Sequence, residues 1–403
     1  MVYLFKSQDL EVNAEVEETI KASQASLVEV SVVIPSINEA KTIGECILKV
    51  KEAFNRCGVY GEVIVADNSE DETPKIAESF GAIVVKPDKM GYGYAYRFGI
   101  KQARGKYLVM GDADGTYDFS EMPKLLEPLM KGEADLVIGS RFKGEIKKGA
   151  MPWLHRHIGN PILTRFLNLF FKAGVSDAHS GFRTVSKDVL EKLNLQCNGM
   201  EFASEMIIKA ALEGLTIKEV PITYYARKAG KSKLNSFQDG WRHLKFMLFH
   251  APVHLYIFPG VLFALLGLLL MAFTFFGVYL GYNPGLHTMI LGSFGILLGF
   301  QLIFLGLFAR IYGVKSKICR ADGFTDAMLK HLALERGATI GAILFLAGVA
   351  YLIHLVLKWF SSGFTVLPLR GQDIIAFTLM TIGLQVFFNS FYLSMISNEL
   401  NQG

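Results

Sequence analysis

The chain has 403 residues, of which 51% are hydrophobic and 19% are charged, and its formal net charge is +4. This length exceeds that of a usual single domain, so we expect at least two structural units. The small net charge says little by itself, the four scattered cysteines lack the spacing of a metal cluster, and we expect no nucleic-acid partner.

Residues 1–27 form an acidic extension without the basic start and apolar centre of a signal peptide. Between residues 28 and 235, short β-branched runs alternate with helical segments. The predicted strands are 28–35, 61–69, 82–86, 106–114 and 134–142, and helices are predicted at 39–54 and 71–81. Buried strands separated by helices predict an α/β domain with a mostly parallel sheet.

Polar residues follow three of these strands. Asn38 comes after the first strand, Asp67 ends the second, and Asp112 and Asp114 end the fourth. Ligands of parallel sheets bind at the carboxyl ends of strands, where a core strand has no need of polar side chains. We therefore expect a binding site at this edge.

Asp112 and Asp114 lie two positions apart, so something should neutralise their repulsion. The segment is not an EF-hand loop, because Tyr117 stands where that loop needs glycine. Helix capping by Asp118 or Ser120 explains the later residues but not the pair. Two carboxylates at a strand end suit a divalent cation that takes its other ligands from phosphates. The pair therefore predicts a metal that holds a diphosphate.

Together these motifs resemble the family 2 glycosyltransferases of the GT-A fold, specifically the dolichyl- or polyprenyl-phosphate glucose and mannose synthases. The similar segments, in family order, are VVIPSINEA (32–40), VADNSEDET (65–73), GDADGTYD (111–118), DLVIGSRF (135–142), SDAHSGFR (176–183) and GKSKL (230–234). The resemblance covers roughly residues 28–250. It implies a Rossmann-like GT-A domain over residues 28–235.

The resemblance implies an inverting, metal-dependent transfer of a sugar from a nucleotide sugar to a membrane polyprenyl or dolichyl phosphate. Asp112 and Asp114 would bind Mg²⁺ or Mn²⁺ and, with Arg141, form the catalytic set. The implied nucleotide-sugar site comprises Pro35, Asn38, Glu39, Asp67, Asn68, Gly91, Gly93, Asp112, Ala113, Asp114, Ser232 and Lys233. Asp67 would contact the base.

The sugar remains open. Thr116 stands where some mannose synthases have a Gln two residues after the second Asp, which argues against Thr116 as a metal ligand and against mannose. UDP-glucose is favoured by the resemblance of the segments around Asp114 and Ser180. UDP-N-acetylglucosamine and GDP-mannose are the alternatives.

A basic loop follows the fifth strand. The resemblance places Arg141, Arg156, Ser180 and Arg183 around the lipid phosphate, which is already anionic and needs cations more than a strong base. Lys143, Lys147 and Lys148 could equally form a solvated loop near anionic headgroups. His179 is interpreted as a neutral, hydrogen-bonding side chain.

Two glycine-containing segments complete the domain. Residues 89–99 (KMGYGYAYRFG) fail the dinucleotide pattern at its last glycine and are interpreted as a glycine-rich loop over the donor, with Gly91 and Gly93 in contact. The second segment is GKSKL (230–234), from which Ser232 and Lys233 would reach the diphosphate. A plain basic linker is the alternative there.

Residues 236–250 have Phe237, Trp241, Leu244 and Leu248 on one helical face, which predicts an interfacial juxtamembrane helix. No Asp, Glu, Lys or Arg then occurs until Arg310. Residues 251–400 predict a transmembrane domain of four helices, at about 253–280, 286–312, 337–359 and 373–397.

Orientation follows from the loops. The connector at 313–336 carries an excess of lysine and arginine, whereas the turn at 281–285 carries no charge. The positive-inside rule makes this connector, both termini and the catalytic domain cytoplasmic. Membrane lipids, and possible further copies of the chain as a homo-oligomer, are the other expected partners.

The sequence leaves two alternative functions. A processive polysaccharide synthase would carry a Gln-x-x-Arg-Trp signature, but here Trp241 precedes Arg242, and no Glu-Asp base is found. A non-enzymatic lipid-sugar flippase or scaffold is disfavoured by the intact Asp112 and Asp114. Strongly polar groups are also few within the spans.

Overall fold

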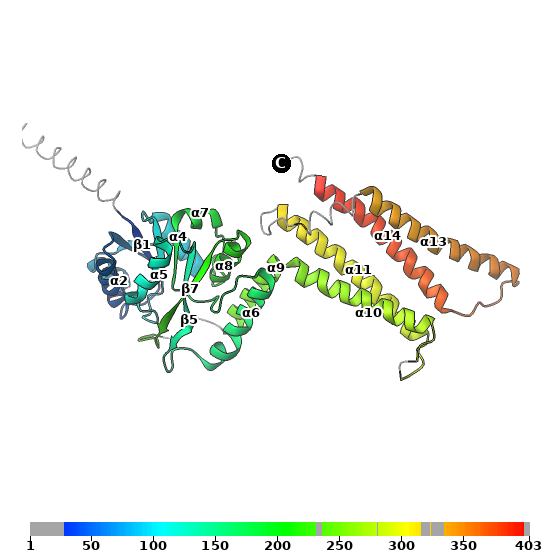
Figure 1. Ribbon diagram of the computed structural model, residues 1–403, viewed down its shortest axis with the longest axis horizontal. Coiled ribbons are helices and arrows are strands. Elements are labelled where there is room, and N and C mark those ends of the chain that lie inside the picture. Colours follow the sequence, from blue (N-terminus) through cyan, green and yellow to red (C-terminus); the bar gives the residue numbers. More distant parts are fainter. Residues whose placement is uncertain (1–27, 231–235, 280, 316–322, 324–333, 399–403) are drawn as a thin grey trace, which may run out of the picture. The chain divides into compact units, whose positions relative to one another are not determined.

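The computed structural model describes residues 28–230, 236–279, 281–315, 323 and 334–398 (Figure 1). The chain divides into two compact units, Met1–Met247 and Leu248–Gly403. The first is an α/β domain and the second is a set of long helices. Two architectural predictions are thereby confirmed, the α/β domain and the helical region that follows it.

A seven-stranded sheet with the order β3-β2-β1-β4-β6-β5-β7 forms the centre of the first unit. Only β6 is antiparallel to its neighbours, β4 and β5. The mostly parallel sheet was predicted, whereas β6 and β7 were not. The strands are β1 Val30–Ser36, β2 Gly61–Asp67, β3 Ile83–Val85, β4 Tyr107–Met110, β5 Leu136–Ile146, β6 Arg183–Ser186 and β7 Ile217–Tyr224.

Helices cover both faces of this sheet (Figure 1). The helices are α2 Ile43–Cys57, α3 Thr73–Ser79, α4 Tyr92–Gln102, α5 Met122–Met130, α6 Asn160–Phe171, α7 Lys187–Leu193, α8 Phe202–Leu212 and α9 Ser236–His250, with shorter turns η1 Phe119–Glu121 and η2 His155–Gly159. Because strand side chains alternate, Val32 and Ile34 join the core under α2 while Val33 faces α4.

The segment predicted as a glycine-rich loop is instead the start of α4. Gly91 has φ +146°, which disfavours any residue with a side chain, and α4 begins at Tyr92. A methyl group added at Gly93 would lie 2.5 Å from the carbonyl oxygen of Cys197. The two glycines therefore let the backbone around Cys197 and Asn198 pack against the start of the helix.

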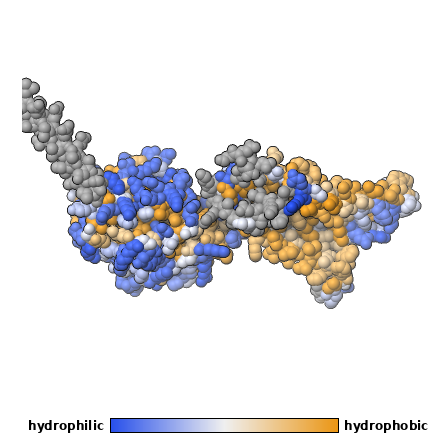
Figure 2. All heavy atoms as spheres, turned by 45° about the horizontal axis from the view of Figure 1, so that its top comes forward, coloured by the Kyte–Doolittle hydropathy of each residue, from blue (hydrophilic) through white to orange (hydrophobic). Residues whose placement is uncertain are grey.

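Among the described residues of the second unit, four helices are long and apolar enough to cross a membrane, as the predicted four-helix transmembrane domain requires. The spans are Val253–Phe275 (η3 Val253–Ile257 with α10 Phe258–Phe275), Leu286–Lys315 (α11), Leu334–Ser361 (α13) and Gly371–Ile396, within α14 Gly371–Asn398. Apolar side chains dominate the visible surface of this unit (Figure 2). Leu265 and Phe294, for example, are 54% and 62% exposed.

Glycines let these helices approach closely in pairs. A methyl group added at Gly292 of α11 would lie 2.7 Å from the carbonyl oxygen of Gly267 in α10. Gly341 and Gly383 have the same relationship between α13 and α14, also at 2.7 Å. A hydrogen bond of 2.6 Å between Ser293 and Thr378 links α11 to α14. Small residues at such contacts suit helices packed within lipid.

Candidate active site

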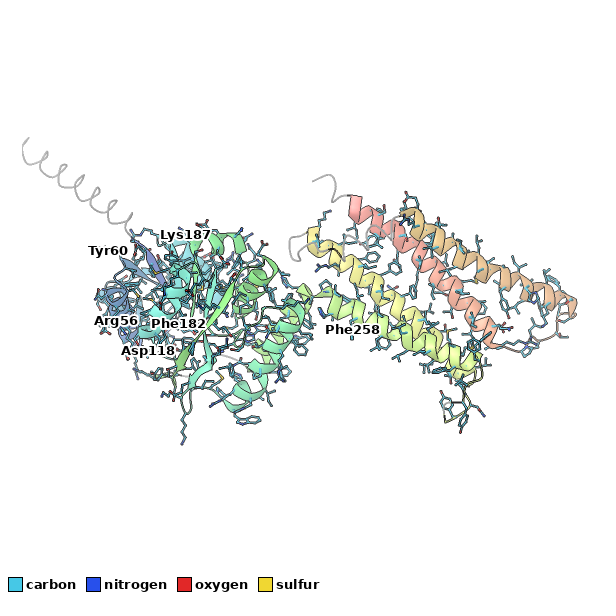
Figure 3. All side chains as sticks on the ribbon, viewed as in Figure 1. Arg56, Tyr60, Asp118, Phe182, Lys187 and Phe258 are labelled. Carbon is cyan, nitrogen blue, oxygen red and sulfur yellow. The ribbon has the colours of Figure 1, made fainter. Side chains whose placement is uncertain are left out.

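The predicted edge of the sheet does bring its polar residues together. β2, β1 and β4 are neighbours, and their carboxyl ends carry Asp67, the Asn38–Glu39 turn and the Asp112–Asp114 loop, respectively. Ala113, between the two aspartates, is buried and its carbonyl accepts a weak hydrogen bond from Cys46 of α2. The core beneath contains Phe182, which is fully buried (Figure 3). A packed core therefore supports the site from below.

Asp67 is buried and its carboxylate is held by two serines. One oxygen accepts hydrogen bonds from the hydroxyls of Ser36 and Ser69, both at 2.6 Å, and the other accepts the backbone N–H of Ser69 at 3.0 Å. The Asn68 amide donates to the carbonyl of Pro87 at 2.8 Å. These contacts give Asp67 one fixed orientation, as a residue that reads a ligand requires.

Asn38, at the end of β1, is exposed and adopts the left-handed conformation with φ +54°. Its side-chain oxygen accepts the backbone N–H of Glu70 at 3.0 Å, which links the first and second strand-end loops. Pro35 lies one residue before the end of β1 and is half-buried. Both residues thus lie beside Asp67 at the same sheet edge.

Asp112 is held by two tyrosines of α4 that the sequence reasoning missed. The Tyr92 hydroxyl lies 2.9 Å from Oδ1 of Asp112, and the Tyr96 hydroxyl lies 3.5 Å from the same atom. A methyl group added at Gly181 would lie 3.0 Å from Oδ2, so that glycine leaves room for the carboxylate. Burial and the nearby charge of Asp114 raise the pKa of Asp112 to about 7.

Both carboxylate oxygens of Asp114 accept hydrogen bonds. Oδ1 accepts hydrogen bonds from the backbone N–H of Thr116 at 3.0 Å and from its hydroxyl at 2.6 Å. Oδ2 accepts a hydrogen bond from Arg227 at 2.7 Å, and the same guanidinium donates to Glu39 at 2.7 Å. The cation that offsets the carboxylates in this structure is therefore Arg227, which the sequence reasoning also missed.

The donor set fits a hard divalent cation. Among the described residues, no group of three or more His, Cys, Asp and Glu side chains could hold a metal by itself. Asp112 and Asp114 supply carboxylate oxygens alone, and Mg²⁺ or Mn²⁺ accepts such ligands while taking others from water and phosphate. The residues present therefore fit a metal shared with a bound diphosphate.

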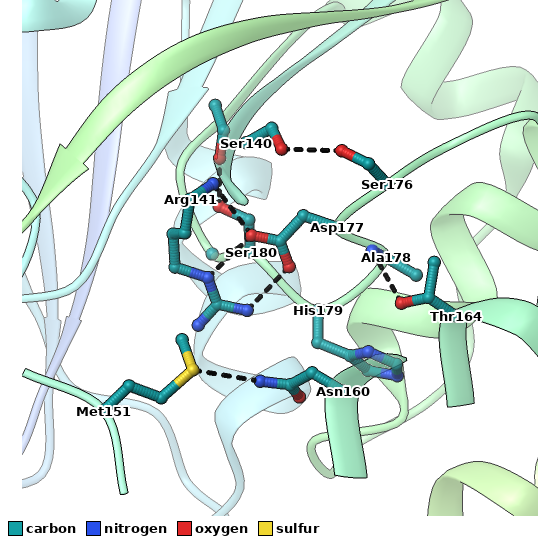
Figure 4. Close-up of polar contacts among 12 residues, drawn as sticks. Ser140, Arg141, Met151, Asn160, Thr164, Ser176, Asp177, Ala178, His179 and Ser180 are labelled. Atoms are coloured by element: carbon teal, nitrogen blue, oxygen red, sulfur yellow. Dashed lines mark hydrogen bonds and ion pairs between the residues drawn. The ribbon is translucent and has the colours of Figure 1, made fainter. Parts of the chain in front are cut away.

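Arg141, on β5, is paired with a buried carboxylate (Figure 4). Its Nε and Nη2 donate to the two oxygens of Asp177, each at 2.7 Å, and its backbone N–H donates to the same carboxylate at 2.9 Å. The two side chains are only 7% and 0% exposed. Burial lowers the pKa of Arg141, but the charge of Asp177 raises it by more. The net shift is upward, so the guanidinium stays charged. Its plane lies over the ring of Tyr224.

Ser180 and Arg183 lie behind Arg141 in the wall of the site. The Ser180 hydroxyl donates to the carbonyl of Gly139 at 2.6 Å. Arg183 is 2% exposed and donates to the carbonyls of Ser180, Ala203 and Ala178. Both residues therefore hold the loop that carries Asp177, and their predicted contact with a lipid phosphate stays a prediction.

The remaining predicted residues are placed as follows. Arg156 lies in η2, which follows the loop after β5, and its side chain is exposed. Gly91 and Gly93 contact the backbone near Asn198, as described above. Ser232 and Lys233 lie outside the described residues.

Two histidines lie in contact beside Ser204 of α8. His243 of α9 is 7% exposed, and its Nδ1 lies 2.7 Å from the hydroxyl of Ser204 on α8. The ring centres of His243 and His179 are 4.5 Å apart. Burial lowers the pKa of His243 to about 4 and lowers that of His179 well below its usual value. Both shifts favour the neutral form, as interpreted for His179. Its Nε2 lies 3.4 Å from the hydroxyl of Ser204, whereas its buried Nδ1 has no hydrogen-bond partner among the described residues.

The α/β domain, with paired aspartates at the carboxyl edge of its sheet, thus precedes four described helices that are long and apolar enough to cross a membrane. Residues 31–194 match the model of glycosyl transferase family 2, and residues 307–397 match that of the glycosyltransferase family 2 C-terminal transmembrane region. The chain belongs to glycosyltransferase family 2. It is thus a glycosyltransferase and an integral membrane protein.

Relatives of this chain include two proteins from Haloferax volcanii. The low-salt glycan biosynthesis hexosyltransferase Agl6 is 48% identical over 367 residues, which cover 91% of this chain and 88% of the relative. A dolichyl-phosphate hexose transferase is 33% identical over 214 residues, which cover 53% of this chain and 89% of that relative. The first match therefore extends into the helical region, whereas the second is confined to about half of the chain.

Solved structures resemble the α/β domain more distantly. Glucosyl-3-phosphoglycerate synthase from Mycobacterium tuberculosis is 22% identical with a TM-score of 0.45, over 56% of this chain and 81% of that chain. A structure of that enzyme with Mn²⁺, uridine diphosphate and glucosyl-3-phosphoglycerate is 23% identical with the same TM-score. Likeness at this level transfers neither substrate nor metal to this chain.

Proposed function

We propose that this glycosyltransferase transfers a hexose from a nucleotide sugar, UDP-glucose favoured, to a polyprenyl or dolichyl phosphate with inversion. The observation that carries the proposal is the meeting of Asp67, Asp112 and Asp114 at one sheet edge. The relatives named hexosyltransferase and dolichyl-phosphate hexose transferase support the reaction class. UDP-N-acetylglucosamine and GDP-mannose are the alternative donors.

In this mechanism each group has a separate task. Asp67, fixed by Ser36 and Ser69, binds the nucleotide, while Asp112 and Asp114 hold Mg²⁺ or Mn²⁺. A divalent cation held by these two carboxylates would supply positive charge beside the leaving nucleotide diphosphate. Arg141 and Arg156 position the acceptor phosphate, whose oxygen is already anionic and attacks the sugar carbon without a strong general base.

An exposed apolar surface next to the basic loop that follows β5 supports a lipid acceptor. Large apolar side chains along η2 and α6 are exposed: Trp153, Leu154, Ile158, Ile162, Phe166 and Leu169. Arg156 stands among them. An amphipathic helix of this kind binds at the surface of a bilayer, where a polyprenyl phosphate presents its headgroup. The cytoplasmic orientation of the domain rests on the positive-inside rule and belongs to this proposal.

The test uses the full chain in detergent or liposomes with one polyprenyl phosphate and a panel of nucleotide sugars. We expect a lipid-linked hexose to form from one donor, with Mg²⁺ or Mn²⁺ present, and to vanish with excess EDTA or in Asp114→Ala. Release of free polysaccharide would favour the processive alternative. Turnover that persists in EDTA would remove the metal from the mechanism.

A further inference from the structure

Arg227 bridges two acidic residues at the mouth of the candidate site. It lies three residues beyond the end of β7 at Tyr224, and its two terminal nitrogens contact Asp114 and Glu39, each at 2.7 Å. Glu39 and Asp114 are 7% and 9% exposed. Two nearly buried carboxylates would repel each other strongly without a cation between them. Arg227 is therefore the counter-ion that makes the site stable in the absence of a ligand.

The chain around Arg227 is fastened to the same loop. The backbone N–H of Tyr225 donates to the carbonyl of Thr116 at 2.9 Å. Next to Arg227, Lys228 contacts both oxygens of Glu45 on α2, at 2.6 Å each. The Lys228 pair is about half exposed on both sides, so it contributes little, whereas the Arg227 side chain is only 25% exposed.

The contacts of Asp114 leave a divalent cation little access to that carboxylate. Thr116 occupies Oδ1 with two hydrogen bonds and Arg227 occupies Oδ2 with one. A divalent cation bound to Oδ2 at about 2.1–2.6 Å would lie beside a guanidinium of the same charge sign. The guanidinium and the cation therefore compete for one side of Asp114.

We propose that Arg227 occupies the metal side of Asp114 until the donor arrives, and that the metal and the nucleotide diphosphate must bind together to displace it. The diphosphate gives the guanidinium an anionic partner, while the metal replaces it at Asp114. Metal alone then binds weakly, because it must break the bridge to Asp114 without offering Arg227 another partner. This inference rests on the proposed metal site and adds a role for a residue outside its ligand set.

Arg227 stays positively charged while it contacts Asp114 and Glu39. Burial lowers its pKa, but Asp114 and Glu39 raise it by more, so the net shift is upward. The bridge therefore cannot be released by deprotonation of the arginine. Arg227 can therefore leave Asp114 only when another anion, such as the diphosphate, replaces that carboxylate as its partner.

The test measures Mn²⁺ binding to the full chain in detergent without nucleotide, from the electron paramagnetic resonance signal of free Mn²⁺. Arg227→Gln should bind Mn²⁺ about tenfold more tightly than the unmutated chain, because the competing cation is gone. Lys228→Gln is the matched control, since it removes one positive charge from the adjacent residue but no contact with Asp114. It should change the affinity by less than about twofold.

A second measurement follows binding of uridine diphosphate in the presence of saturating Mn²⁺, by calorimetry. Arg227→Gln should weaken this binding severalfold, because the guanidinium is no longer available to the diphosphate, whereas Lys228→Gln should not. Arg227→Lys, which keeps the charge but cannot bridge two carboxylates as a fork, should fall between the two in both measurements. Thermal melting of each variant without metal checks that it is folded, and Arg227→Lys carries the test if Arg227→Gln is not.

Asp114→Asn separates the two proposals. If it abolishes Mn²⁺ binding in the presence of uridine diphosphate, while Arg227→Gln binds Mn²⁺ alone no more tightly than the unmutated chain, the metal site stands and the competition is refuted. If Asp114→Asn binds Mn²⁺ in the presence of uridine diphosphate as well as the unmutated chain does, the metal site itself is refuted and the inference fails with it.

Discussion

The hydroxyl of Tyr92 donates a hydrogen bond of 2.9 Å to the carboxylate of Asp112, from the first turn of α4 to the end of β4. A hydrogen bond to a charged group contributes about 1.5–3 kcal/mol. Tyr92→Phe should therefore lower both Mn²⁺ affinity in the presence of donor and kcat by roughly tenfold. Isothermal titration and initial rates measure the two effects.

Tyr94→Phe is the matched control for that substitution. Tyr94 lies on the same helix, but its hydroxyl donates to the exposed Asp88 and not to the site. We expect rates within about twofold of the unmutated chain, as for most surface substitutions. Equal losses in the two variants would mean that α4 is disturbed as a whole and that Tyr92 has no specific role.

The buried pair of Arg141 and Asp177 predicts a large loss of stability when either partner is removed. Asp177→Ala leaves a buried guanidinium without its carboxylate, which costs about 3–5 kcal/mol. The apparent Tm of the α/β domain should fall by more than about 6 °C. Lys147→Ala breaks an exposed pair with Glu145 and should lower it by at most about 2 °C. A small shift for Asp177→Ala would mean that water reaches the pair.

Arg156 separates phosphate binding from stability better than Arg141 does, because its side chain is exposed. If it binds the lipid phosphate, Arg156→Ala should lower kcat/KM for polyprenyl phosphate roughly tenfold to a hundredfold with an unchanged Tm. Lys148→Ala, also exposed, should cost about 1 kcal/mol or less, and only in anionic membranes. Equal, lipid-dependent losses in both variants would make the loop a membrane anchor alone.

The strand-end residues were predictable because their signal is local. Each strand is a short apolar run that ends in a polar residue, so Asp67, Asp112 and Asp114 could be placed at one edge without knowledge of the packing. The four spans were equally clear, since a charge-free run has one simple physical interpretation. Asp114 and Arg227, in contrast, are 113 positions apart, and no local pattern connects them.

Helix α4 shows why the tyrosines were missed. Its sequence YGYAYRFGIKQ contains two glycines and several aromatic residues, which weaken the helical signal. The helix forms because Gly99 lets it pack directly on Val33 of β1 and Ala66 of β2. Tertiary contact thus overrides propensity. The tyrosines at helical spacing, Tyr92 and Tyr96, were the signal that could have revealed a face turned toward Asp112.

The last prediction concerns pH. His243 has a pKa of about 4 in the folded chain, against an ordinary value near 6.5. Between these values the unfolded chain binds a proton that the folded chain does not, so stability falls as the pH drops through this window. Lowering the pH from 7.5 to 5 should cost about 2 kcal/mol from this residue alone. The groups that face it are His179, which behaves in the same way, and the cationic Arg183.

His243→Asn keeps a polar partner for Ser204 but has no proton to gain. It should be less stable than the unmutated chain at pH 7.5, because it fills the site less well. Its apparent Tm should then fall by about 4–8 °C less on acidification to pH 5, so the difference between the two proteins narrows or reverses. Titrating groups away from the pair, such as Asp112 with its raised pKa, act on both proteins alike and cancel in this comparison. His179 does not cancel, because His243 contributes to its lowered pKa. Equal decreases in apparent Tm for the two proteins across this window would show that His243 takes up its proton as readily in the folded chain as in the unfolded chain, and would contradict the lowered pKa.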